Sequence, residues 1–148
     1  MKNLYLSLIT VALTLAAFSC HSKNVICSVE QTIQAEKQLA ALHSWTDAIT
    51  YYKANKTCID GGVGEGYSNF LASKLALRDG ASSLWNETAK QRWFRGVVAK
   101  KMPSESISLD VTEEIFQNLK PYCPASAKNF CCDLRVKIKK TCPACDQK

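Results

Sequence analysis

The sequence predicts an all-α protein, with about five helices in one disulfide-stapled domain. Two observations predict it, and a third, which resembles a strand, does not overturn it. Residues 28–56 contain no glycine or proline, and their apolar side chains recur at helical spacing. Eight cysteines occur in a chain of 148 residues, which is typical of a small domain held together by disulfides. Residues 134–140 alternate as a strand would, but no second strand is predicted to pair with them, so helix is favoured there too.

The N-terminal residues 1–19 have the layout of a signal peptide. Lys2 precedes a charge-free apolar run, and Ala17-Phe18-Ser19 supplies the small-residue cleavage pattern. The apolar run is shorter than the roughly 20 residues that a membrane span needs. We therefore expect export, with residues 20–148 forming a single helical domain that ends in a cysteine-rich tail.

Cys20 stands where a bacterial lipoprotein carries its lipidated cysteine. Ala17 and Phe18 depart from the lipoprotein pattern, in which leucine and a small residue are usual. Two outcomes therefore stay open, a lipid anchor on Cys20 in the bacterial envelope or plain cleavage and release into the periplasm. Acylation of Cys20 would leave an odd number of cysteines for disulfide formation.

The first helix is expected over residues 28–56, where Ser28 and Gln31 form a capping-box pair. Gly61-Gly62 then permits a tight bend, because glycine adopts backbone conformations that other residues resist. The second helix is expected over residues 64–78, where it ends before an Asp-Gly pair.

Three more helices follow. Asn86 is expected to cap the third, which turns Trp93 and its apolar neighbours inward and stops at Met102-Pro103. The fourth begins near Asp110, which is followed three residues later by Glu113. Pro124 suits the first position of the fifth, because proline lacks the backbone N–H that is unpaired there anyway.

Seven cysteines are candidates for disulfides, and their pairing is not readable from the sequence alone. They are Cys27, Cys58, Cys123, Cys131, Cys132, Cys142 and Cys145.

Helix geometry argues against one pair. If the fifth helix starts at Pro124, the Cα atoms of Cys123 and Cys131 lie roughly 11–12 Å apart, beyond the limit of about 7 Å for a disulfide. We expect Cys58 to pair with Cys123 instead. Cys131 and Cys132 should then have different partners, with Cys27 and the two C-terminal cysteines as candidates.

The C-terminal Cys142-Pro-Ala-Cys145 motif has a functional alternative. A C-x-x-C pair at a helix N-terminus can act as a redox dithiol, because the helix stabilises the thiolate. Only three residues follow Cys145, so the long helix of the thioredoxin context is missing, and a structural disulfide is favoured. No metal ligand set and no cofactor are expected.

The bend at residues 58–68, CIDGGVGEGYS, is expected to be the start of a helix. Its Gly-x-Gly-x-Gly spacing is not a phosphate-binding pattern, because no Lys-Ser/Thr pair follows it. Two carboxylates near one bend could act as acid and base, but carboxylates near a helix start more often cap it. No catalytic residue is assigned. The candidate binding surface consists of Asp60, Glu65, Tyr67 and Ser68.

Three motifs follow one another along the chain. Trp45 precedes the Cys58-x-Asp-Gly-Gly-x-x-Glu-Gly-Tyr-Ser68 bend, and Cys123-Pro124 and Cys131 come later. This order resembles small exported proteins of Gram-negative bacteria that are helical and have no assigned activity. The resemblance covers about residues 40–135 and implies a fold and a compartment, but no catalytic residue. It does not extend to Cys132 or to the two C-terminal cysteines.

These features favour a non-enzymatic periplasmic or envelope-tethered binding protein, with an immunity or inhibitor protein against a toxin or hydrolase as its specific version. The expected partner is another protein. Nucleic acid is not expected, because a net charge of +6 is mild and no dense Lys/Arg stripe occurs; the basic run 135–140 is expected to be a solvated face. The alternatives are an enzyme using Asp60 and Glu65 and a thiol–disulfide protein using Cys142 and Cys145.

Overall fold

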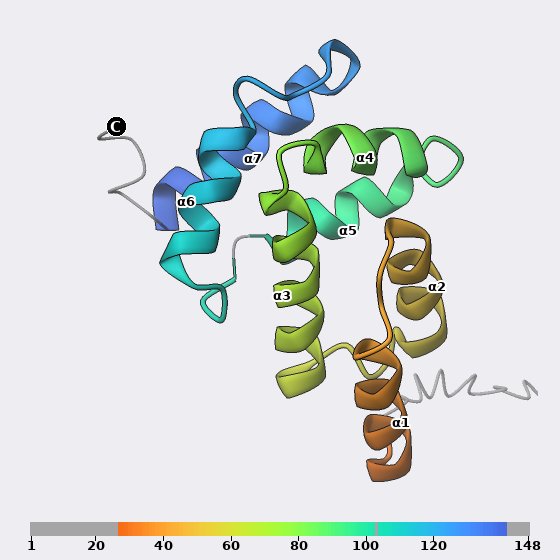
Figure 1. Ribbon diagram of the computed structural model, residues 1–148. Coiled ribbons are helices and arrows are strands. Elements are labelled where there is room, and N and C mark those ends of the chain that lie inside the picture. Colours follow the sequence, from red (N-terminus) through yellow and green to blue (C-terminus); the bar gives the residue numbers. More distant parts are fainter. Residues whose placement is uncertain (1–26, 103, 142–148) are drawn as a thin grey trace, which may run out of the picture.

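The computed structural model describes residues 27–102 and 104–141. Within these residues the chain forms seven α-helices, one 3-10 turn and no strand (Figure 1). The all-α prediction is confirmed, whereas the prediction of about five helices was too low. The helices are α1 (Val29–Leu39), α2 (Trp45–Asn55), α3 (Gly61–Ala76), α4 (Gly80–Glu87), α5 (Trp93–Lys101), α6 (Leu109–Asn118) and α7 (Lys128–Thr141), and the 3-10 turn is η1 (Ala125–Ala127).

The predicted first helix is in fact two helices. It is interrupted after α1, and Ser44 starts α2 with a second capping box. The Ser44 hydroxyl accepts a hydrogen bond from the backbone N–H of Asp47 at 3.0 Å, and the Asp47 carboxylate accepts one from the backbone N–H of Ser44 at 2.9 Å. These two hydrogen bonds satisfy donors that a helix start leaves free. The break therefore needs neither glycine nor proline.

The second additional helix is α4, in a segment between the second and third predicted helices. Asn86, the predicted cap of the third helix, lies inside α4 instead. Helix α5 follows Arg92 without any side-chain cap. Trp93, predicted to face inward, is 45% exposed, whereas the next residue, Phe94, is completely buried.

Helix α3 lies at the centre and packs against α1, α4 and α6 (Figure 1). Its glycines allow this packing. Gly61 has a φ of +53°, which glycine adopts most easily. A Cβ atom at Gly66 would lie only 2.6 Å from Leu39 of α1, and one at Gly64 would lie 3.3 Å from the Ile59 backbone. The glycine-rich bend thus starts a helix and brings α3 close to α1.

The core fills the space between α3 and its neighbours. Trp45 of α2 is completely buried, and its indole N–H donates to the Ser83 hydroxyl of α4 at 3.0 Å. This hydrogen bond satisfies the one polar atom of a large apolar side chain and joins two helices that are distant in the sequence. The other large side chains that are fully buried are Tyr67, Phe94, Leu71, Leu75, Leu84, Met102, Ile115, Leu119, Leu134, Ile138 and Val98.

Two disulfides close loops of very different length. Cys27, just before α1, pairs with Cys58, just before α3, and their Cα atoms are 5.0 Å apart. Cys123 pairs with Cys131, with a Cα–Cα distance of 6.3 Å. The predicted Cys58–Cys123 pair and the exclusion of Cys123–Cys131 were both wrong.

The prediction about Cys123 and Cys131 was wrong because the last helix begins later than expected. Pro124 is extended, with φ −64° and ψ 144°, and α7 begins only at Lys128 after the short η1 turn. Cys123 therefore precedes the helix and is not part of its first turns. The chain folds back between them, so that Cys123 meets Cys131. The helix prediction for residues 134–140 is confirmed, because α7 continues to Thr141.

Several predictions fall on other parts of the chain. The predicted signal peptide, Cys20, Cys142 and Cys145 lie outside the described residues. Within the described residues, Cys132 is exposed and carries no disulfide. No helix in residues 27–102 and 104–141 combines the length and apolar character that a membrane crossing requires.

Candidate functional site

The surface predicted at the glycine bend is only partly exposed. Asp60 and Glu65 are exposed, and the Asp60 carboxylate accepts the Gly61 N–H at 2.9 Å as the cap of α3. Tyr67 is completely buried, and its hydroxyl donates to the Ala48 carbonyl at 2.9 Å. The prediction that Tyr67 belongs to a binding surface was wrong. Two residues advance a helix by roughly 200°, so Tyr67 faces away from Glu65.

Ser68 is buried as well, and its hydroxyl donates to the Gly64 carbonyl one turn earlier, at 2.9 Å. It nevertheless lines a hollow of about 380 Å³ at the start of α3. The hollow brings Asp60 and Glu65 together with Lys100 and Lys101 from the end of α5. The other lining residues are Gly61, Gly64 and Ser104.

Two carboxylates and two lysines give this glycine-bend hollow no net charge. Lys101 is also engaged, because its ammonium group donates to the Ile59 carbonyl at 3.3 Å. Asp60 and Glu65 are recognisable in the sequence because they are close along the chain. The two lysines are not, because only the fold brings the end of α5 to the start of α3.

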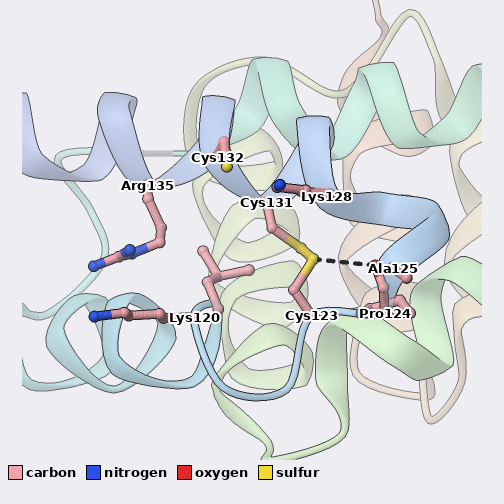
Figure 2. A pocket seen from close by; sticks show the side chains of 9 residues that line it. Lys120, Cys123, Pro124, Ala125, Lys128, Cys131, Cys132 and Arg135 are labelled. Atoms are coloured by element: carbon pink, nitrogen blue, oxygen red, sulfur yellow. Dashed lines mark hydrogen bonds between the residues drawn. A yellow bond between two sulfur atoms is a disulfide. The ribbon is translucent and has the colours of Figure 1, made fainter.

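A second hollow, of about 310 Å³, lies between α6 and α7 (Figure 2). We call it the basic hollow, because three of its lining side chains are cationic and none is a carboxylate. The cationic side chains are Lys120, Lys128 and Arg135. The remaining lining residues are Leu119, Cys123, Pro124, Ala125, Cys131 and Cys132.

The end of α6 and the first half of α7 place the three cations. Lys120 follows α6, Lys128 is the first residue of α7, and Arg135 lies two turns later on the same face of α7. The disulfide between Cys123 and Cys131 joins the connecting segment to α7 and forms one wall of the hollow. Figure 2 shows Lys120, just after α6, and Arg135 of α7 extending toward the same side.

Arg135 is the most constrained of the three cations. Its guanidinium carbon lies 4.3 Å from the centroid of the Phe116 ring, a cation–π distance. Its Nε atom is buried and has no hydrogen-bond partner among the described residues. The head group is thus held in place by the Phe116 ring, and its Nε donor stays unused among the described residues.

Cations around a partly apolar hollow favour binding of an oxyanion. Hydrogen bonds between charged groups are about twice as strong as neutral ones, and a lower local dielectric strengthens them further. The helical spacing of Lys128, Cys132 and Arg135 is visible in the sequence and could have indicated part of this site. Lys120 could not have been added without knowing that α6 packs against α7.

The fold and the two hollows define an all-α, disulfide-bonded protein with a basic surface at one end. Comparisons of the chain with protein-family models, with curated proteins and with solved structures find no match.

Proposed function

We propose that this chain is an exported, non-enzymatic binding protein that holds an acidic surface of another protein at the basic hollow. The finer version is an immunity or inhibitor protein that blocks a toxin or hydrolase. Two disulfides support an oxidising compartment, because such bonds persist mainly outside the cytoplasm.

The observation that carries the proposal is the charge of the basic hollow. Lys120, Lys128 and Arg135 surround it, and no lining residue neutralises them. Complementary charge steers a partner into place and selects against wrong partners. Hydrolases commonly use carboxylates as acid and base in their active-site clefts. A cationic surface that covers such a cleft would inhibit the enzyme without any chemistry of its own.

The test compares two charge-reversed variants. Lys120→Glu/Lys128→Glu changes two exposed residues of the basic hollow. Lys37→Glu/Lys56→Glu makes the same change in charge at an exposed lysine of α1 and at the exposed lysine that follows α2. Proteins captured from the host's envelope extract by the oxidised wild type are identified, purified and titrated calorimetrically with all three proteins.

We expect an acidic partner whose affinity falls about tenfold or more with the hollow variant, and stays near the wild-type value with the control variant. Co-expression of the wild type should also relieve the toxicity or hydrolytic activity of that partner. A partner that binds the hollow variant as tightly as the wild type would refute the proposal, and so would the absence of any partner that binds in purified form.

A further inference from the structure

A second cationic hollow lies on the other side of the η1 turn. Its volume is about 470 Å³, and we call it the arginine hollow. It is lined by Trp85, Asn86, Ala89, Arg92, Arg95 and Ser126. Ser126 belongs to η1, and its neighbour Ala125 lines the basic hollow, so the two hollows flank one turn. A ring contact between Trp85 and Phe130, with centroids 5.9 Å apart, joins α4 to α7 here.

Arg95 is fixed in this hollow by three contacts. Its guanidinium carbon lies 3.5 Å from the centroid of the Trp85 ring. Its Nη2 atom donates to the Trp85 carbonyl at 2.7 Å, and its Nε atom donates to the Thr88 hydroxyl at 2.9 Å. Holding the planar group in this way leaves its other N–H donors in a set position, and less conformational entropy is lost when a ligand binds.

No carboxylate within the described residues neutralises Arg95. Partial burial lowers the pKa of its guanidinium, and the positive charge of Arg92 lowers it further. Arginine nevertheless stays protonated in proteins. A partly buried charge without a counter-charge costs free energy that a matching anion would recover. Asn86 and Ser126 add neutral donors to the same hollow.

We infer that the arginine hollow is a binding site for an oxyanion, a carboxylate or a phosphate group, held between Arg92 and Arg95. The planar guanidinium of Arg95 suits both kinds of oxygen pair. Which molecule carries this oxyanion group depends on the proposed function. If the partner is an acidic protein, one of its carboxylates occupies the basic hollow and another occupies the arginine hollow, on either side of η1.

The geometry favours this site over the glycine-bend hollow. There, Asp60 and Glu65 line the same hollow as Lys100 and Lys101, so an added anion would compete with two carboxylates. In the arginine hollow the lining residues carry positive charge only.

The experiment follows side-chain N–H signals by nuclear magnetic resonance in protein with its disulfides formed. Inorganic phosphate and a capped hexaglutamate peptide are titrated separately at constant ionic strength. The Arg95 Nε–H and the Trp85 indole report on the site, and the buried Trp45 indole serves as an internal reference. Arg92→Gln removes an exposed charge of the hollow, and Lys37→Gln removes one from α1.

We expect saturable shifts of the Arg95 and Trp85 signals with at least one probe, with about tenfold weaker binding in Arg92→Gln and wild-type binding in Lys37→Gln. Saturation by hexaglutamate supports a protein carboxylate as the source, and saturation by phosphate alone supports a phosphate-bearing ligand. Shifts that never saturate, or that weaken equally in both variants, would overturn the inference. Neither titration uses the protein partner, so the proposed function can fail separately.

Discussion

Tyr51 of α2 and Tyr67 of α3 stack in the core with their ring centroids 5.3 Å apart, but only one of the two hydroxyls has a hydrogen-bond partner. Tyr51 is 3% exposed and Tyr67 is completely buried. The Tyr67 hydroxyl donates to the Ala48 carbonyl, whereas the Tyr51 hydroxyl is buried without a partner among the described residues. The hydroxyl group therefore stabilises the fold at Tyr67 and costs free energy at Tyr51.

Removal of each hydroxyl should have opposite consequences. Tyr67→Phe loses a buried hydrogen bond, and we expect it to lower the free energy of unfolding by about 1 kcal/mol. Tyr51→Phe removes a buried group that lacks a partner, so its stability should equal or exceed that of the wild type. Urea denaturation of the oxidised proteins measures both. Equal destabilisation by the two variants would contradict this assignment of hydrogen bonds.

The raised pKa of Tyr67 predicts that the free energy of unfolding falls at alkaline pH. Burial, and then the neighbouring Tyr52 and Tyr51, raise the pKa of Tyr67 well above its usual value. Below the unfolded-state pKa of about 10, both states keep the proton and stability is complete. Above it, only the unfolded state releases the proton, so stability falls by about 1.4 kcal/mol per pH unit from this residue.

Urea denaturation from about pH 9.5 to 11, with free thiols blocked, measures that slope. The decline should be shallower in Tyr67→Phe, because phenylalanine has no proton to release. An equally steep decline in the variant would assign the alkaline destabilisation to other groups.

Two glycines offer a second matched comparison. A Cβ atom at Gly96, exposed on α5, would meet nothing within 4 Å. Gly96→Ala should therefore raise the free energy of unfolding by about 0.5–1 kcal/mol, because alanine favours a helix over glycine. A Cβ atom at Gly80 would lie 2.7 Å from the Leu75 carbonyl oxygen and would also meet the backbone of Lys74. Gly80→Ala should lower it by about 2 kcal/mol or more.

Thermal unfolding of both variants checks the pair. A destabilised Gly96→Ala would mean that α5 has a close neighbour at this position. A fully stable Gly80→Ala would mean that the turn between α3 and α4 is less tight than described.

Local patterns predicted the helical class, and they failed where distant residues meet. The capping box of Ser28 and the start of a helix near Asp110 were readable, because each depends on neighbours within one turn. The second capping box, Ser44 with Asp47, is equally local, but it lies inside an uninterrupted helical pattern that gives no other sign of a break. Tertiary packing alone places Trp93 at the surface and Phe94 inside.

The candidate sites follow the same division. Asp60 and Glu65 were identified because they are close in the sequence. The basic hollow combines Lys120 with Arg135, and the arginine hollow combines Trp85 with Ser126; each combination depends on two helices or turns meeting in space. The periodicity of apolar residues within one helix does not predict which other helix packs against it.

Substitution of the two glycine-bend carboxylates distinguishes a binding protein from an enzyme. Asp60→Asn/Glu65→Gln keeps the size of both side chains and removes both charges. We expect the variant to keep full affinity for the partner and full protection in cells, because the basic hollow lies elsewhere. Calorimetry and the protection assay measure the two properties. If protection is lost while the fold and the affinity are kept, the enzymatic alternative would be favoured over simple binding.

Removal of one described disulfide should mainly affect stability, and removal of the other should mainly affect binding. On the chain-entropy account, the Cys27–Cys58 bond spans 31 residues and contributes about 4 kcal/mol. The Cys123–Cys131 bond spans 8 residues and contributes about 2.5 kcal/mol. Cys27→Ser/Cys58→Ser should therefore cost more stability. Cys123→Ser/Cys131→Ser should cost less stability but weaken partner binding about tenfold or more, because this bond holds a wall of the basic hollow.

Both variants are best compared in a Cys132→Ser background, because the exposed Cys132 thiol could otherwise join two molecules through a disulfide. Urea denaturation gives the stability of each, and calorimetry with the purified partner gives the affinity at a temperature where both stay folded. If both variants lose affinity in proportion to their stability, the hollow has no special role and binding depends on the fold as a whole. If only Cys123→Ser/Cys131→Ser loses affinity, the short disulfide acts on the binding surface itself, because the other variant has lost more stability and still binds.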